Sequence, residues 1–150
     1  QTRSSYMFTA PPLFDLGSKQ ANKALTTFLG DKYAKACKDL CIDASNATVA
    51  WLHLWKDKTS GRYKYAVVPS GEIVPVWSKS LEKELVGVLR CYHDVTDGGE
   101  ELDVYEYWND KECQAYAVPA GFTIDEGLCI LLVYCDRYEW EQQPIQPVYT

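Results

Sequence analysis

The stretch TVAWLHLWKDKTSGRYKYAVV, Thr48 to Val68, is apolar on both faces of two strand-like segments that flank a polar turn. A turn centred on residues 58–59 predicts a hairpin whose register sets Trp55 across from Tyr63. Small and aliphatic side chains then occupy one face of this hairpin. The other face gathers aromatic rings and one imidazole, which come from Trp51, His53, Trp55, Tyr63 and Tyr65.

This aromatic face has two interpretations. Trp and Tyr combine a large apolar body with a polar tip, which suits a surface that is alternately wet and bound. On this interpretation the five side chains bind a partner. The alternative is a second core beneath the helix or another sheet, since aromatic pairs across strands are ordinary packing.

Further strand-like segments follow the hairpin, separated by turns rich in Gly, Asp and Asn. These turns are short enough for hairpins and no long helix lies between them, which predicts a mainly antiparallel sheet. The predicted strands cover 48–56, 62–69, 72–78, 86–95, 102–108, 112–118 and 127–136.

One amphipathic helix is predicted before the hairpin. Apolar residues recur at every third or fourth position from Ser18, a good N-cap, to Cys41. Gly30 weakens the middle of this helix by up to about 1 kcal/mol and is a candidate position for a break.

The segment LCILLVYCD, residues 128–136, has apolar side chains on both faces, which predicts a central strand covered on both sides. One helix covers only one face of a sheet, so the second face needs another layer or closure of the sheet. The sequence therefore predicts an α+β fold: one N-terminal helix on a curved, mainly antiparallel sheet or partial barrel of about six to seven strands, stapled by disulfides. A flat two-layer sheet is the alternative.

A single domain is predicted over residues 1–150, because 150 residues with 47% apolar content are ordinary for one globular domain. Residues 1–17 contain two adjacent prolines and no sustained period, so we expect an N-terminal arm. Residues 141–150 contain two prolines, and we expect an extended tail.

The cysteines and one triplet predict the compartment. An even count of six, without the Cys-x-x-Cys pairs of zinc sites, predicts three disulfides. Asn46 opens a pattern for N-glycosylation, and the chain begins at Gln1 without a charged or apolar leader. Together these features predict a mature secreted, extracellular glycoprotein. The predicted disulfide residues are Cys37, Cys41, Cys91, Cys113, Cys129 and Cys135.

The net charge of −6, with Lys and Arg scattered along the chain, disfavours binding to a phosphate backbone. No apolar run approaches the roughly 18 residues of a membrane span. We therefore expect a monomer with no nucleic-acid partner and no membrane span. The acidic loop pattern of calcium sites is also missing, and we expect no metal and no cofactor.

The residues available for catalysis are few. Only His53 and His93 offer an imidazole acid or base, and the sequence has no nucleophile elbow, zinc-protease motif or phosphate loop. This inventory favours a protein that is not an enzyme, and no catalytic residue is assigned. A small secreted hydrolase or nuclease that uses His53 or His93 is one alternative.

The sequence as a whole predicts a secreted interaction protein, effector-like or of salivary type, that recognises a protein or glycan partner through the aromatic face. No motif identifies a family, although the general profile is similar to that of small secreted proteins of fungal pathogens and arthropod salivary binding proteins. A further alternative is a lipocalin-like carrier of a small ligand in a β-barrel cavity.

Overall fold

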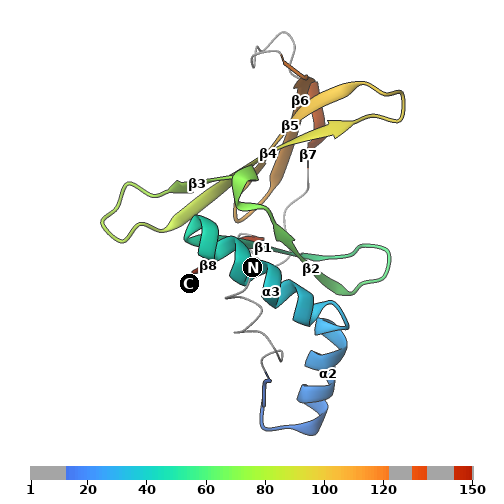
Figure 1. Ribbon diagram of the computed structural model, residues 1–150, viewed down its shortest axis with the longest axis vertical. Coiled ribbons are helices and arrows are strands. Elements are labelled where there is room, and N and C mark those ends of the chain that lie inside the picture. Colours follow the sequence, from blue (N-terminus) through green and yellow to red (C-terminus); the bar gives the residue numbers. More distant parts are fainter. Residues whose placement is uncertain (1–12, 122–129, 135–143, 150) are drawn as a thin grey trace. The chain divides into compact units, whose positions relative to one another are not determined.

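The structure is a computed structural model that describes residues 13–121, 130–134 and 144–149 (Figure 1). Over these residues the fold is α+β, with two α-helices and two antiparallel sheets. The coarse fold class predicted from the sequence is confirmed. Backbone contacts divide the chain into two compact units: unit 1 holds Gln1–Ser70 and Gln146–Thr150, and unit 2 holds Gly71–Ile145.

The described part of unit 1 contains two helices. α2 (Lys19–Leu29) begins after Ser18, whose Oγ accepts a hydrogen bond from the Ala21 N–H at 3.4 Å. Gly30 ends α2 with a φ of 63°, which is outside the helical region and suits glycine. α3 (Tyr33–Ala47) follows after a short turn. The break at Gly30 is confirmed, and the prediction of one continuous helix is wrong.

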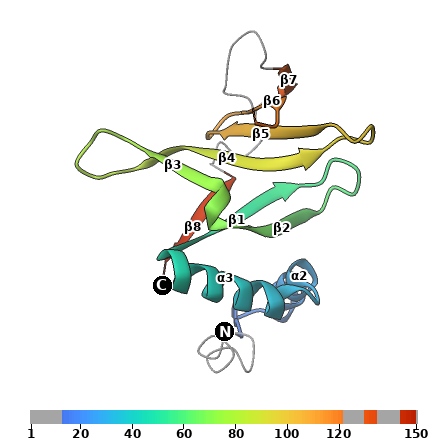
Figure 2. The same ribbon diagram turned by 45° about the horizontal axis from the view of Figure 1, so that its top comes forward.

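The sheet of unit 1 has the strand order β2 (Tyr63–Val68), β1 (Val49–Lys56), β8 (Ile145–Tyr149). α3 packs against β1 and β2, and Figure 2 shows the helices on one side of this sheet. The rings of Phe28 in α2 and Tyr65 in β2 lie 5.6 Å apart between centroids. The helices therefore cover the face of the sheet that carries Tyr65.

The register of the β1–β2 hairpin differs from the prediction by one residue. Trp55 pairs with Lys64 and not with Tyr63. The cause is the length of the turn, because the Asp57 N–H donates to the Arg62 carbonyl at 2.8 Å and so closes a loop one residue longer than predicted. A shift of one residue moves the side chains of one strand to the opposite face. The predicted register is therefore wrong.

Unit 2 contains a five-stranded sheet in which each strand pairs antiparallel with the next one along the chain. A short 3₁₀ helix, η1 (Ser70–Glu72), precedes it. The strand order is β3 (Ile73–Trp77), β4 (Leu85–Val95), β5 (Glu101–Trp108), β6 (Cys113–Pro119), β7 (Ile130–Tyr134).

The seven predicted strands each have a counterpart, from β1 to β7. The predicted arrangement is wrong, because the described strands form two sheets instead of one curved sheet or partial barrel. β7, which was predicted to be central, is the last of the five described strands in its sheet. Apolar residues on both faces of a strand thus did not indicate a central position here.

One face of the unit 2 sheet forms its core. Val88, Val104 and Ala117 are buried on this face. On the opposite face Cys91 lies across from Tyr105, and more of the surface is exposed.

No disulfide joins any two of the four cysteines that the structure describes, so the predicted staples among them are wrong. Cys37 and Cys41 lie one turn apart on α3, and Cys91 and Cys113 lie on opposite faces of the unit 2 sheet. Neither arrangement brings two sulfur atoms together. Cys129 and Cys135 lie outside the described residues.

The predicted ends of the chain fall partly outside the described residues. Residues 13–17 belong to neither a helix nor a strand, and residues 145–149 form β8. The single domain, the arm over 1–17 and the extended tail over 141–150 stay predictions. Among the described residues, no helix is both long and apolar enough to cross a membrane.

Candidate functional site

The five residues of the predicted aromatic face do not share one surface. Trp51 is buried, with 2% of its surface exposed, and the rings of His53 and Trp55 on the same face lie 5.2 Å apart. Tyr63 and Tyr65 lie on the opposite face, which the helices cover at Tyr65. Tyr63 is 53% exposed. The prediction that these residues bind a partner was based on a common face, which they do not share. Their partner-binding role stays a prediction.

The end of the β1–β2 hairpin gathers positive charge that the sequence analysis did not single out. Asp57 Oδ2 organises this turn: it accepts hydrogen bonds from Ser60 Oγ at 2.6 Å and from the Ser60 N–H at 3.2 Å. Lys64 Nζ lies 3.2 Å from the same oxygen. The hydrogen bonds from Ser60, and then from Lys64, lower the pKa of Asp57 to about 2. The basic residues of this turn are Lys56, Lys58, Arg62 and Lys64.

The two units carry opposite net charge. Unit 1 has ten Lys and Arg against five Asp and Glu, a net charge of +5. Unit 2 has five Lys and Arg against sixteen Asp and Glu, a net charge of −11. The net charge of −6 hides this separation, which a count on either side of residue 70 would have found.

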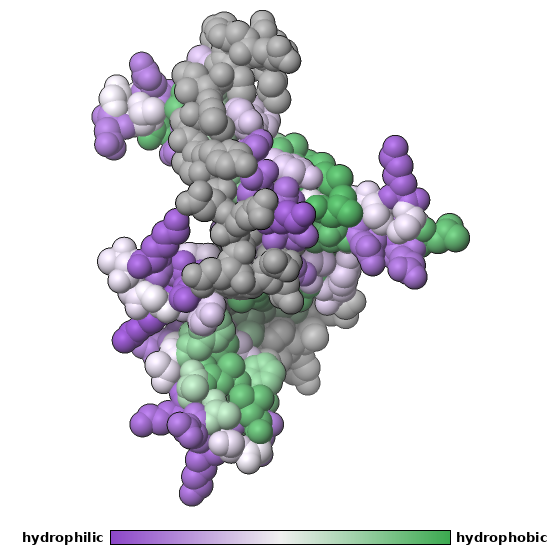
Figure 3. All heavy atoms as spheres, turned by 180° about the vertical axis from the view of Figure 1, so that it is seen from behind, coloured by the Kyte–Doolittle hydropathy of each residue, from purple (hydrophilic) through white to green (hydrophobic). Residues whose placement is uncertain are grey.

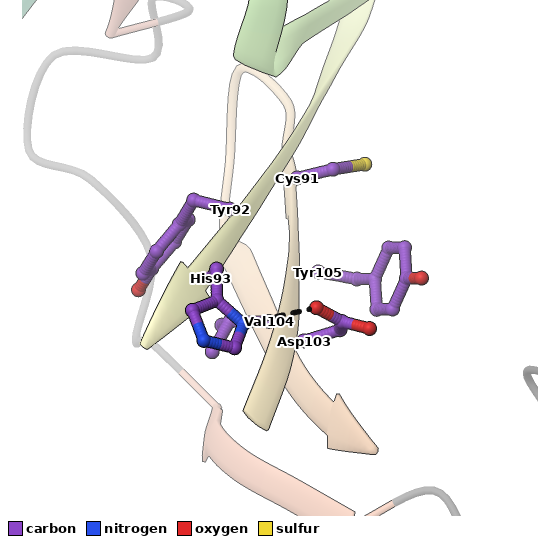
Figure 4. A pocket seen from close by; sticks show the side chains of 6 residues that line it. All are labelled: Cys91, Tyr92, His93, Asp103, Val104 and Tyr105. Atoms are coloured by element: carbon purple, nitrogen blue, oxygen red, sulfur yellow. Dashed lines mark hydrogen bonds and ion pairs between the residues drawn. The ribbon is translucent and has the colours of Figure 1, made fainter. Parts of the chain in front are cut away.

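The end of the β4–β5 hairpin in unit 2 is acidic, and a shallow, solvent-open depression of about 330 Å³ lies on this hairpin. Figure 4 shows that His93 and Asp103 point toward each other, and His93 Nδ1 lies 3.4 Å from Asp103 Oδ1. The depression is lined by Cys91, Tyr92, His93, Asp103, Val104 and Tyr105.

The depression offers little chemistry. Burial raises the pKa of the Cys91 thiol, which is the opposite of what an activated thiolate needs. His53 and His93 belong to different units. Among the described residues, no group of three or more His, Cys, Asp and Glu is placed to hold a metal ion.

A polar network lies on the core face of unit 2 instead. Glu106 accepts hydrogen bonds from Tyr92 Oη at 2.9 Å and from Trp108 Nε1 at 3.0 Å. Arg90 Nη1 lies 3.6 Å from Glu106 Oε2, and Arg90 Nε donates to Glu72 at 2.9 Å. The Arg90 guanidinium also stacks over the Tyr92 ring at 4.2 Å from its centroid. This network ties η1 to β4 and β5.

The β3–β4 hairpin exposes apolar side chains. Hydrogen bonds fix its turn, since the Ser78 N–H donates to the Glu84 carbonyl at 2.7 Å and the Glu84 N–H donates to Ser78 Oγ at 3.0 Å. Figure 3 shows hydrophobic surface at the outer end of this hairpin, bordered by hydrophilic residues. Leu81 in the turn is 100% exposed. The exposed apolar residues are Val74, Val76, Trp77, Leu81 and Val86.

Residues 1–129 match the protein family described as phage portal protein, SPP1 Gp6-like. This match covers most of the chain, and the chain therefore belongs to that family. A particular relative is the portal protein of Clostridium phage phiCD119, which is 38% identical over 127 residues. The alignment covers 76% of this chain and 28% of the relative. The chain thus spans little more than a quarter of the length of that portal protein.

Family membership overturns the functional predictions. The chain is not a secreted effector-like or salivary-type protein, a lipocalin-like carrier or a secreted hydrolase. The secreted, extracellular location and the disulfide-stabilised class are wrong as well. The misleading features were an even cysteine count and one short triplet, and both arise readily in proteins that are never exported. Asn46 lies exposed in the last turn of α3, and its glycosylation stays an untested prediction.

Proposed function

We propose that this chain is part of a phage portal subunit, a component of the virion that is assembled in the cytoplasm of the host cell. Copies of the subunit form an oligomer that binds other phage proteins and DNA. The observation that carries this proposal is the family match over residues 1–129, supported by 38% identity to the phiCD119 portal protein. The proposal replaces the expectation of a monomer that binds no nucleic acid.

The β3–β4 hairpin supplies a contact for a second copy of the subunit. Its apolar side chains include Leu81, which is 100% exposed on a turn that hydrogen bonds hold in place. Apolar side chains that gather on one exposed hairpin are typical of contacts between proteins, and a closed ring uses two different surfaces of each subunit. Lys79, Glu82, Lys83 and Glu84 give this turn no net charge, so it can approach an acidic or a basic neighbour without repulsion.

Pro75 favours contact through side chains over strand pairing. β3 is the first strand of the described sheet, so one of its edges has no strand partner among the described residues. Proline lacks the N–H that pairs strands, and it protects such edges from adding another strand.

The test is the oligomeric state of the full-length subunit, measured by size-exclusion chromatography with light scattering. We expect a closed oligomer for the natural protein and a shift toward monomer for Leu81→Asp, with an unchanged melting temperature. Leu13→Asp is the matched control, because Leu13 is 94% exposed in unit 1. A natural subunit that stays monomeric contradicts the portal proposal. An oligomer that tolerates Leu81→Asp as well as Leu13→Asp contradicts the contact at β3–β4.

A further inference from the structure

The end of the β1–β2 hairpin, residues 56–64, is a basic segment of the surface that the structure describes. Four of its nine residues are Lys or Arg and one is Asp, which gives a net charge of +3. Each of the four basic residues is exposed. In Figure 3 this end of the hairpin is hydrophilic. The charges therefore face solvent at one place in unit 1.

The turn holds these charges in a fixed arrangement. The Gly61 N–H donates to the Asp57 carbonyl at 2.7 Å, and Gly61 has a φ of 66° that other residues rarely adopt. Two hydrogen bonds from Ser60 to the Asp57 side chain hold the turn further. An ordered turn loses less conformational entropy when it binds than a loose loop does.

The only acidic side chain of the segment does not engage Lys58 or Arg62. Asp57 is engaged by Ser60 and Lys64. Lys58 and Arg62 form no ion pair with any described residue, so their charge is available to an external anion.

An exposed aromatic ring lies among these cations. Lys56 Nζ lies 6.0 Å from the centroid of the Tyr63 ring, and Tyr63 is 53% exposed. Lys and Arg neutralise phosphates, while Tyr side chains contact phosphate oxygens and sugars and stack on bases. Basic side chains around an exposed tyrosine are thus typical of a surface that binds a nucleic-acid backbone.

We infer that residues 56–64 bind the phosphate backbone of DNA, with Lys58 and Arg62 as the principal phosphate contacts. This inference rests on the proposed function, which places the subunit on DNA, and adds the surface that makes the contact. Binding is independent of base sequence, because phosphate contacts carry no sequence information. The net charge of +5 on unit 1 adds attraction close to this surface, within the roughly 8 Å over which exposed charges act at physiological salt.

The test uses the full-length subunit in its assembled form and a fluorescein-labelled DNA duplex of random sequence. Fluorescence anisotropy gives the affinity at several salt concentrations. Lys58→Gln/Arg62→Gln should weaken binding at low salt by at least ~10-fold and should reduce the slope of log affinity against log salt by about two, one for each lost phosphate contact. Lys19→Gln/Lys23→Gln removes two exposed charges of α2 in the same unit and should change affinity less than about twofold if contact, not net charge, decides binding.

Three results would overturn the inference. One is an unchanged affinity and salt slope in Lys58→Gln/Arg62→Gln, and another is an equal loss in the α2 control. The third is a variant that binds DNA normally but no longer assembles, which would assign the segment to an acidic protein surface. Assembly of the natural subunit is read separately, so a failure of the portal proposal is distinguishable from a failure of this surface. Lys58→Arg/Arg62→Lys should restore both affinity and slope, which separates charge from folding.

Discussion

The β1–β2 and β4–β5 hairpins are closed by similar turns and carry opposite charges. In the first turn the Gly61 N–H donates to the Asp57 carbonyl at 2.7 Å, and in the second the Gly99 N–H donates to the Thr96 carbonyl at 2.8 Å. Both glycines have positive φ angles, 66° and 82°. The glycines and their hydrogen bonds fix the backbone of each turn. The net charge of each hairpin end therefore depends on the side chains that point outward from it. The acidic residues of the second hairpin end are Asp94, Asp97, Glu100, Glu101 and Asp103.

The stems of the two hairpins are stabilised differently. The stem of β1–β2 buries the Trp51 side chain, whereas the stem of β4–β5 contains the hydrogen-bonded carboxylate of Glu106. Burial of a large ring depends on packing volume, while a half-buried carboxylate depends on its donors. We therefore expect the stability of unit 1 to fall most when a buried side chain is truncated. The stability of unit 2 should be sensitive to the loss of a hydrogen-bond acceptor.

The largest effect is expected for Trp51→Ala in the β1–β2 stem. Trp51 is only 2% exposed, and truncation of a buried ring to Ala costs about 3–5 kcal/mol in the free energy of unfolding. Tyr63→Ala, at a position that is 53% exposed in the same hairpin, should cost far less. Denaturant unfolding of the two variants beside the natural chain measures the difference. An equal loss of unfolding free energy in the two variants would mean that the buried stem and the exposed end of the hairpin contribute equally to stability.

A smaller effect is expected for Glu106→Gln in the β4–β5 stem. The amide keeps the shape of the carboxylate but has one acceptor oxygen for the two donors Tyr92 Oη and Trp108 Nε1. One partly buried donor then loses its partner, which costs about 1–3 kcal/mol. Glu101→Gln changes an exposed carboxylate of the same strand and should stay within about 0.5 kcal/mol of the natural chain.

The same variant has a pH signature. Burial, and then the hydrogen bond to Glu106 and its charge, raise the pKa of Tyr92 to about 12 from an ordinary 10.0. Because the folded pKa lies above the unfolded one, Tyr92 stabilises the fold fully below pH 10.0 and loses this contribution as the pH rises toward about 12. Ultraviolet titration should show a lower pKa for Tyr92 in Glu106→Gln. An unchanged titration would mean that Glu106 does not govern this tyrosine.

The sequence predicted the strands well and the pairing of side chains poorly. Strand positions follow from apolar alternation and turn residues, which are local signals. The face that Tyr63 occupies depends on whether the turn holds three or four residues, and this was decided by the Asp57–Arg62 hydrogen bond. One residue of error was enough to assemble an aromatic face that the protein does not have.

The basic end of the β1–β2 hairpin was missed for a different reason. Whole-chain charge was used to exclude DNA, although the positive charge is concentrated before residue 70 and around Lys58 and Arg62. The boundary between the units follows from contacts between residues far apart in the sequence, which periodicity does not reveal. A charge count in windows along the chain would have found the asymmetry. Spacing and composition did not identify the family, because this sequence shows no short motif that points to it.

The smallest loss of stability is expected for Gly87→Ala, at a closely packed position of the β4–β5 stem. A Cβ on Gly87 would lie 2.5 Å from Tyr107 Oη and 2.8 Å from Tyr107 Cζ, so the ring must move. Tyr107 is partly exposed and can turn outward, and we therefore expect Gly87→Ala to cost about 1 kcal/mol, the lower end of overpacking effects. Gly98→Ala in the turn meets nothing closer than Thr96 Oγ1 at 3.8 Å and should be nearly neutral. In a Tyr107→Ala background the cost of Gly87→Ala should vanish, because the three atoms nearest to the added Cβ all belong to that side chain. The unfolding free energies of the natural chain, Gly87→Ala, Tyr107→Ala and the double variant form a double-mutant cycle. A cost that persists without the Tyr107 ring would place the strain in the backbone of β4.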